Sequence, residues 1–326
     1  MRTQRPLAAS ATGLLGIGCL LLAGATANGT TADAGKVTKV STADELKDAL
    51  SSATAGETIR LADGTYRGNF TTTKSGSDGS PITLTGSRRA VLTADGGYGL
   101  HLDGAAHWNL DGFTVTGGQK GIVLDASDDA HLDGLSVHGL DMEGVHWRKS
   151  SSGGSIENSE IHDTGKNGSG AGEGVYIGSA GGTDDKSDNV LVQNNTIGPH
   201  VGGENIDVKE GTTGTKIVGN TFDGNGLTGA NYDDSWVDVK GNKVRVEKNT
   251  GKHTTNDGFE VHSAQDGWGC GTVFKGNKAD LSGASGRDQY AINVTDYDAD
   301  NCPATVADDN TVKGGKGLAN PGVPVG

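Results

Sequence analysis

The chain is poor in cysteine, proline and aromatic residues and rich in glycine. Of its 326 residues, three are cysteines, six are prolines, 5% are aromatic and 56 are glycines. This balance is unusual for a globular fold, but it suits an architecture that turns tightly and often. The composition therefore predicts a chain with frequent, periodic turns.

Long apolar runs are also scarce, and the main one covers only residues 13–23. That run is too short for a convincing membrane span. Arg2 and Arg5 precede it and small residues follow it, which is the pattern of a cleaved secretory signal peptide. We therefore predict a signal peptide over residues 1–27 and a secreted, extracellular protein.

Positive charge is in short supply, because 27 basic side chains face 41 acidic ones and the formal net charge is −14. Nucleic acids and anionic membranes are poor partners for such a surface. An acidic polysaccharide would also be repelled unless a divalent cation or a local basic cluster intervened. Because the sequence gives no firm sign of oligomerisation, we expect a monomer.

The few cysteines do not form a metal-binding motif. Cys19 lies in the predicted signal peptide, and Cys270 and Cys302 have no CxxC spacing or neighbouring histidine pattern. In an oxidising extracellular location, a disulfide between Cys270 and Cys302 is the natural expectation, and it would hold the last coils together.

Short patterns recur at intervals of about one solenoid coil. The segment Leu110-Asp111-Gly112-Phe113 returns 22 residues later as Leu132-Asp133-Gly134-Leu135. Further along the chain, asparagines recur at equivalent turns, and stacked asparagines of this kind hydrogen-bond from coil to coil along the solenoid axis. These asparagines are Asn195, Asn220, Asn249, Asn277 and Asn310.

Seven short segments form a column of predicted parallel strands, from residues 121–124 to residues 291–294. Period-2 alternation sends two rows of apolar side chains inward. The first row is Ile122, Val145, Val175, Ile206, Val237, Phe259 and Ile292. The second row is Leu124, Trp147, Ile177, Val208, Val239, Val261 and Val294. The two rows predict the core of an all-β fold, a right-handed parallel β-helix.

The ends of the chain differ from this repeat. Residues 41–50 are predicted to form an N-capped amphipathic helix that covers the open end of the first coil. We assign residues 28–40 to a flexible leader, residues 41–313 to the β-helix catalytic domain and residues 314–326 to a tail.

Two glycine-rich polar segments, residues 165–188 and 224–235, interrupt the coil period. Loops of that length on a solenoid usually form the walls of a groove on one face. The alternative is that they are disordered insertions without a function.

The same alternation points the intervening side chains outward in three rows. The first is Lys120, Glu143, Glu173, Glu204, Ser235, Asp257 and Gln289. The second is Val123, His146, Tyr176, Asp207, Asp238, Glu260 and Asn293, and the third is Asp125, Arg148, Gly178, Lys209, Lys240, His262 and Thr295. Carboxylates stacked at the coil spacing of about 4.8 Å repel one another. This indicates a functional face, although a solvated face neutralised by its own lysines, arginine and histidine is the alternative.

Clustered carboxylates suit calcium, which accepts about six to eight oxygen ligands in flexible geometry. The sequence has no DxDxDG loop, so the ligands would have to come from separate coils. We predict Glu173, Glu204 and Asp207 as calcium ligands, with Asp238 as a further candidate.

The segment Glu204-Asn205-Ile206-Asp207-Val208-Lys209, followed by Asn220-Thr221-Phe222, resembles the family 6 polysaccharide lyases, which include alginate lyases and chondroitinase B. The resemblance implies a calcium-dependent β-helix enzyme in which Glu204 is a calcium ligand and Lys209 the catalytic base. Gly202 stands where that family has a second glutamate, and Lys240 lies nearest to the position of its catalytic arginine. The chain also resembles pectate-lyase-like secreted β-helix proteins of actinobacteria.

We therefore expect a lyase that cleaves a uronic-acid polysaccharide of the pectate, alginate or glycosaminoglycan type by β-elimination. Lys209 would remove the C5 proton, and Lys240, His262 or Arg148 would assist the leaving oxygen. The predicted substrate-binding residues are His146, Tyr176, Glu260 and Trp236.

Two other functions remain open at this point. One is a glycoside hydrolase on the same fold, with an acid and a base chosen from Glu173, Asp207, Asp238 and Glu260. The other is a carbohydrate-binding β-helix without catalytic activity.

Overall fold

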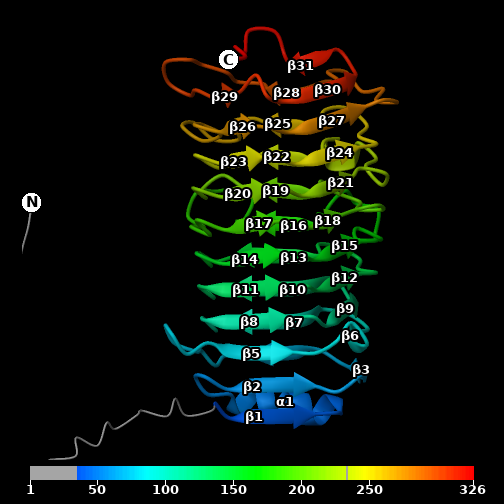
Figure 1. Ribbon diagram of the computed structural model, residues 1–326, viewed down its shortest axis with the longest axis vertical. Coiled ribbons are helices and arrows are strands. Elements are labelled where there is room, and N and C mark those ends of the chain that lie inside the picture. Colours follow the sequence, from blue (N-terminus) through cyan, green and yellow to red (C-terminus); the bar gives the residue numbers. More distant parts are fainter. Residues whose placement is uncertain (1–34, 233) are drawn as a thin grey trace, which may run out of the picture. The chain divides into compact units, whose positions relative to one another are not determined.

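The structure, a computed structural model, describes residues 35–232 and 234–326. The predicted signal peptide and residues 28–34 of the predicted leader lie outside the described residues. Within the described part, no helix is long and apolar enough to cross a membrane. The described residues form a parallel β-solenoid, in which successive coils stack along one axis (Figure 1).

Each coil contributes strands to three parallel sheets that run along the solenoid. Sheet 1 contains β1 (Val37–Val40), β2 (Thr58–Leu61), β5 (Ile82–Thr85), β8 (Trp108–Asp111), β11 (Ala130–Asp133), β14 (Ser155–Glu157), β17 (Leu191–Gln193), β20 (Lys216–Val218), β23 (Arg245–Glu247), β26 (Val273–Lys275) and β29 (Thr305–Val306). Sheet 2 contains β3 (Gly64–Arg67), β6 (Ala90–Ala94), β9 (Thr114–Gly117), β12 (Ser136–His138), β15 (Glu160–His162), β18 (Thr196–Ile197), β21 (Thr221–Asp223), β24 (Thr250–Lys252), β27 (Lys278–Leu281) and β30 (Thr311–Gly314).

Sheet 3 is the predicted strand column. It contains β4 (Phe70–Thr72), β7 (Tyr98–Asp103), β10 (Lys120–Asp125), β13 (Val145–Arg148), β16 (Val175–Ile177), β19 (Ile206–Val208), β22 (Val237–Val239), β25 (Phe259–Val261), β28 (Tyr290–Val294) and β31 (Gly317–Ala319). The register confirms the prediction, since Ile122 pairs with Val145 and Ile206 pairs with Val237. All fourteen predicted inward side chains are buried, which places the core inside the coils.

The predicted asparagine ladder is present along the turns between sheets 1 and 2. In each step, the side-chain Nδ2 of one asparagine donates to Oδ1 of the asparagine in the next coil, at 2.9–3.1 Å. The ladder runs through Asn195, Asn220, Asn249, Asn277 and Asn310. Each amide also satisfies buried backbone groups, so the ladder fixes the spacing of the coils that carry the site.

We expect Asn249→Ala to lower the free energy of unfolding by about 3 kcal/mol. The substitution removes the side chain that binds the buried Ile217 carbonyl and the backbone N–H of Asn220. Urea denaturation would measure this loss. Asn301→Ala, in which an exposed amide that binds Asp298 is removed, is the matched control and should stay within about 0.5 kcal/mol of wild type. Equal stability of the two variants would contradict a structural role for the ladder.

Helix α1 (Ala43–Ser52) lies at the N-terminal end of the solenoid (Figure 1). The Thr42 hydroxyl oxygen accepts the Glu45 backbone N–H, and the Glu45 carboxylate accepts the Thr42 backbone N–H, which is a complete capping box. Its apolar face buries Leu46 and Leu50 in the core. The helix therefore covers the first coil, as the sequence predicts.

The solenoid extends beyond the boundaries expected from the sequence. Strand β1 pairs with β2, so residues 37–40 belong to the first coil and not to a flexible leader. At the other end, β31 pairs with β28, so part of the predicted tail completes a coil. The physical reason is that an unpaired strand edge needs a cover, and these short strands provide it.

The expected disulfide is present. Cys270 and Cys302 are joined by an S–S bond, with their Cα atoms 4.6 Å apart. The bond links two loops of the C-terminal coils across 32 residues of sequence. The loop that the disulfide closes contains β26, β27 and β28, so the bond holds the last coils together as expected.

Candidate active site

The main cavity lies over the outer face of sheet 3, around β16, β19, β22 and β25. Its volume is about 640 Å³. Its lining consists of Glu143, Ala171, Glu173, Tyr176, Ala180, Glu204, Asp207, Lys209, Asn231, Tyr232, Asp234, Asp238, Lys240, Asn256, Glu260, His262, Arg287, Asp288, Thr295 and Asp296. The cavity therefore collects outward residues from the middle of the strand column, from Glu143 to Thr295.

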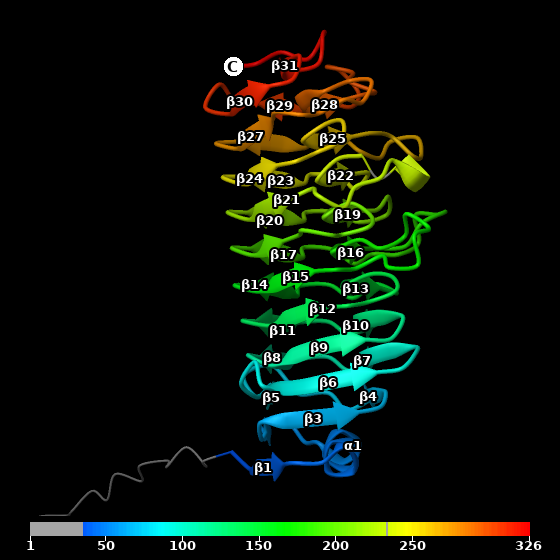
Figure 2. The same ribbon diagram turned by 90° about the vertical axis from the view of Figure 1, so that its right-hand side faces the viewer.

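The walls come from long loops that project on one side of the solenoid (Figure 2). The predicted segment 165–188 contributes Ala171 and Ala180, and the predicted segment 224–235 contributes Asn231 and Tyr232. The two loops meet, because a Cβ on Gly170 would overlap the carbonyl oxygen of Ala230 in the 3₁₀ turn η1 (Ala230–Tyr232). The two segments therefore form walls of the groove. Sequence reasoning missed a third wall segment, which contains Arg287 and Asp288.

Three carboxylates converge on the floor of the cavity. Glu173, Glu204 and Asp207 each offer an oxygen, and these oxygens all lie within 4.8 Å of one another. All three side chains are buried, whereas the sequence places them on a solvent-facing stripe. The expectation of exposure is wrong because the wall loops cover this part of the sheet and adjacent coils bring the side chains into contact.

Two lysines flank this carboxylate group. The Lys209 Nζ lies 2.6 Å from Oδ2 of Asp207 and 5.3 Å from the centre of the Tyr176 ring. The Lys240 Nζ lies 3.0 Å from Oδ1 of Asp207 and also pairs with Asp238. Asp207 therefore bridges both lysines.

Burial sets the protonation of the group. Burial and the neighbouring Asp207 raise the pKa of Glu173 to about 8, and burial with Asp207 and Asp238 raises the pKa of Glu204 well above its usual range. Burial alone would lower the pKa of Lys240, but Asp207 and Asp238 outweigh it and hold that pKa well above normal. Lys240 therefore stays protonated and is a poor base.

A second acidic pair lies beside the lysines. Burial would raise the pKa of Asp238, but Lys240 and His262 hold it below its usual range. The His262 Nδ1 lies 3.1 Å from Oδ1 of Asp238. Burial and the nearby Asp238 raise the pKa of Glu260 to about 8. Asp238 is thus ionised and Glu260 protonated near neutral pH.

The cavity fits a divalent cation. The Oε2 atom of Glu173 is buried without a hydrogen-bond partner, and it belongs to the three-carboxylate group. Among the described lining residues, nine are acidic and three are lysine or arginine. A hard cation with oxygen ligands would bind this excess of carboxyl groups and displace the protons that burial keeps on some of them. Asp238, the fourth predicted ligand, lies instead in ion pairs with Lys240 and His262.

Trp236 does not line the cavity, and its prediction as a substrate-binding residue is wrong. Its side chain is fully buried, its indole N–H donates to the carbonyl of Lys252 at 3.0 Å, and its ring packs on Phe259. Glycines at 251 and 258 leave the space that the ring fills, because a Cβ on either would collide with it. The ring therefore serves the core.

His146 is also absent from the cavity lining, contrary to its predicted contact with substrate. It is buried, and burial and Lys120 lower its pKa to about 3. The ring is therefore neutral, accepts from Lys120 through Nδ1 and donates from Nε2 to the carbonyl of Gly178 at 2.9 Å. Its ring packs against the Tyr176 ring with centroids 4.4 Å apart, so it supports Tyr176 from the neighbouring strand.

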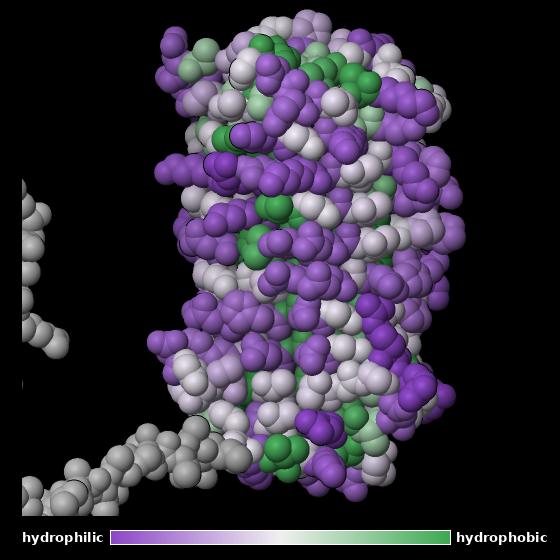
Figure 3. Space-filling model, in the orientation of Figure 1, coloured by the Kyte–Doolittle hydropathy of each residue, from purple (hydrophilic) through white to green (hydrophobic). Residues whose placement is uncertain are grey.

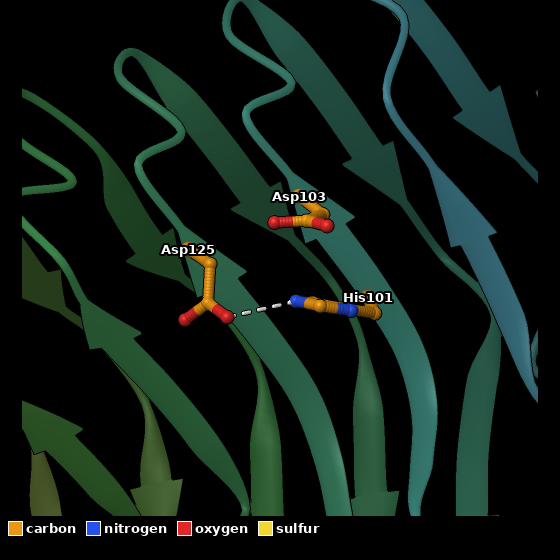
Figure 4. A group of neighbouring side chains, drawn as sticks. All are labelled: His101, Asp103 and Asp125. Carbon is orange, nitrogen blue, oxygen red and sulfur yellow. Dashed lines mark hydrogen bonds and ion pairs between the residues drawn. The ribbon is translucent and has the colours of Figure 1, made fainter.

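Arg148, one of the predicted catalytic residues, lies outside the cavity lining. Its guanidinium pairs with Asp125 and donates to the Tyr98 hydroxyl at 3.0 Å. Asp125 forms a second group with His101 and Asp103 (Figure 4). In this group, Asp125 already binds Arg148, Lys149 and His101, so its charge is compensated without a metal.

The comparisons with known proteins agree with this geometry. The family model for the right handed beta helix region matches residues 98–301. The crystal structure of an alginate lyase from Paenibacillus sp. str. FPU-7 is 35% identical, over 89% of this chain and 97% of that one, with a TM-score of 0.77. No curated protein sequence matches the chain.

Two more distant structures share the fold. Pectate lyase Pel9A is 15% identical, over 86% of this chain and 79% of that one, with a TM-score of 0.64. A mannuronic acid specific polysaccharide family 6 lyase from human gut microbiota is 16% identical, over 87% and 67%, with a TM-score of 0.54. The chain therefore belongs to the right-handed β-helix family and, within it, to the polysaccharide lyases.

Proposed function

We propose that the protein is a secreted, calcium-dependent lyase that cleaves a uronic-acid polysaccharide by β-elimination, with alginate as the first substrate to test. The observation that carries the proposal is Lys209 beside the converging carboxylates of Glu173, Glu204 and Asp207. The 35% identical relative is an alginate lyase, which favours alginate over the other polymers.

Glu173, Glu204 and Asp207 would hold the calcium ion. A cation there would neutralise the uronate carboxylate, make the C5 proton more acidic and release Lys209 from its ion pair. Once freed from Asp207, Lys209 would lose its proton to solvent, and its neutral amine would then accept the C5 proton as the C4–C5 double bond forms and the C4–O bond breaks. Its place on the cavity floor, beside Tyr176, supports this role.

The leaving oxygen needs a proton, and Tyr176 is the best placed donor. Burial, with the charges of Asp207 and Glu173, raises the pKa of Tyr176, so its phenol keeps its proton. The ring lines the cavity, and the Lys209 Nζ lies 5.3 Å from its centre, so the proton that Lys209 gains would stabilise the phenolate that Tyr176 leaves on donation. Lys240 is protonated too, but two carboxylates already occupy its ammonium. We therefore assign the acid to Tyr176 in preference to Lys240, His262 or Arg148.

Ultraviolet absorbance of the conjugated double bond tests the proposal. The protein is incubated with alginate, polygalacturonate, chondroitin or dermatan sulfate, and glucuronan, each with calcium and with EDTA. A calcium-dependent rise on one polymer identifies the substrate. Reducing ends without a rise in absorbance would reject elimination.

The second candidate is a glycoside hydrolase that uses Glu260 and Asp238. Its support is the opposite protonation of these two neighbours, since one stays protonated and the other ionised. The hydrolase would be favoured if wild type released reducing ends without any unsaturated product and Glu260→Gln lost that release. Glycan binding without chain shortening would favour a binding protein instead.

Secretion is part of the proposal. The Cys270–Cys302 disulfide supports an oxidising location, because disulfides persist outside the cytosol.

Hydrophilic side chains cover most of the face in Figure 3, which suits contact with a polar polymer. Mass spectrometry of protein recovered from culture medium would test the cleavage after residue 27.

A further inference from the structure

Two loops joined by hydrogen bonds bound the C-terminal side of the cavity. One carries Tyr232 and the other carries Arg287, and together they are called the rim. The side chain of Asn256 is buried, and its Nδ2 donates to Oδ2 of Asp234 at 3.1 Å. Its Oδ1 accepts the backbone N–H of Asp288 at 2.7 Å. One buried amide thus joins the loop that carries Tyr232 to the loop that carries Arg287. The rim is therefore a fixed part of the fold.

Tyr232 is displayed by this rim. Its side chain is 86% exposed, and the other large hydrophobic residues exposed in the described ranges, Val37 and Val325, lie outside the cavity. The backbone of Asn231 and Tyr232 is left-handed, with φ of 53° and 65°, which is unfavourable for residues with a side chain. The Asp234 amide, which donates to the Tyr232 carbonyl at 3.0 Å, helps to hold this conformation. An exposed aromatic ring at the edge of a cavity offers a flat apolar face on which a sugar ring can stack.

Arg287 supplies positive charge at the same rim. Lys209 and Lys240 line the cavity too, but Asp207 holds both of them. The Arg287 side chain is 88% exposed and pairs with one oxygen of Asp288 at 2.9 Å. A guanidinium has five N–H donors in a planar fork, so donors remain for a carboxylate of a ligand.

Arg287 lies at a distance from the reacting group. Lys209 follows β19, and Arg287 precedes β28, which is three strands further along sheet 3 in the order β19, β22, β25 and β28. At one coil per step, this separation is about 14 Å along the axis. A group bound at Arg287 therefore belongs to a sugar several units from the bond that is cleaved.

We propose that Tyr232 and Arg287 form a distal binding site for a polyuronate chain, in which Tyr232 stacks on a sugar ring and Arg287 binds a uronate carboxylate. The inference rests on the proposed function and deepens it. It means that the enzyme holds long chains better than short ones, because a short oligosaccharide at Lys209 does not reach Arg287.

The test compares Tyr232→Ala and Arg287→Ala with wild type on alginate, or on whichever of the four polymers wild type cleaves. Affinity gel electrophoresis measures binding, and initial rates give kcat and KM. We expect the apparent Kd and KM for long chains to rise roughly tenfold and kcat to stay within about twofold in both variants, and trisaccharide kinetics to be unchanged in Arg287→Ala. The Arg287 effect should weaken at high salt.

Conservative variants and a matched control separate binding from folding. Tyr232→Phe should keep wild-type binding and Arg287→Lys should keep part of it, since ring and charge remain. Arg89→Ala is the control, because Arg89 is 82% exposed and pairs with an aspartate outside the cavity. We expect no change in its binding.

The outcomes distinguish this inference from the lyase function. Unchanged binding in both alanine variants would overturn the distal site, while cleavage by wild type would leave the lyase function standing. Binding without cleavage by wild type would reject the lyase, and the variants would still decide the site by their affinity. Neither binding nor cleavage of any polymer would overturn both.

Discussion

Lys209→Ala is expected to lower kcat for polysaccharide cleavage by about 10²–10⁴-fold, which is the usual contribution of a positioned general base. The side chain lies on the cavity floor, with its Nζ 2.6 Å from Asp207 and above the Tyr176 ring. Asp207 keeps its second partner, Lys240, at 3.0 Å, so the loss should not unfold the site. Initial rates of unsaturated product, with thermal unfolding as a check on the fold, measure the effect.

Two comparisons sharpen this prediction. Lys252→Ala removes a lysine that pairs with Asp223 on sheet 2, outside the cavity, and its rate should equal that of wild type. Tyr176→Phe keeps the aromatic ring beside the lysine and removes only the hydroxyl. A large fall in kcat in this variant would identify Tyr176 as the proton donor. If Lys209→Ala cleaves as fast as wild type, the base is another group, and the pair Glu260 and Asp238 becomes the leading alternative.

The sequence predicts the strand column and the asparagine ladder well, and for a physical reason. Every coil repeats the same contact, so an error in one strand would break the register of all its neighbours. Ile122, Val145 and Val175 therefore align in the structure as the period-2 pattern requires. The same regularity brings Glu173, Glu204 and Asp207 together from separate coils.

The wrong predictions concern side chains whose direction the strand repeat does not determine. Trp236 directly precedes a strand, and its sequence position does not show that glycines 251 and 258 make room for it in the core. Arg148 stands in an outward row, but its partner Asp125 lies in the preceding coil and holds it away from the cavity. Pairwise contacts of this kind depend on side-chain conformation, which strand alternation does not determine.

Loops account for the remaining differences. The burial of the outward carboxylates depends on how segments 165–188 and 224–235 fold over the sheet, and glycine-rich loops have no periodicity from which to predict that. Arg287 was not predicted as a site residue for the same reason. Its place at the rim comes from the contacts of Asn256, a residue that looks like any turn asparagine in the sequence.

Calcium is expected to raise the thermal stability of the wild type, and Glu204→Gln is expected to abolish that shift. Glu173, Glu204 and Asp207 are buried within 4.8 Å of one another, and the Glu173 Oε2 has no partner. Loss of one charged ligand should weaken calcium binding by at least about 100-fold, because affinity follows the number of charged ligands. Cleavage activity should be lost in parallel, both in this variant and in wild type treated with EDTA.

The same variant should be more stable than wild type when no calcium is present. A neutral glutamine relieves the repulsion and desolvation of the crowded carboxylates, and a gain of about 1 kcal/mol corresponds to roughly 1–2 °C in Tm for a unit of this size. The two stability curves should therefore cross as calcium is titrated. Glu160→Gln, at an exposed glutamate that pairs with Arg88, is the matched control and should keep the calcium shift. A wild-type Tm that does not respond to calcium would reject the metal site, because three buried carboxylates that bind the ion must be stabilised by it.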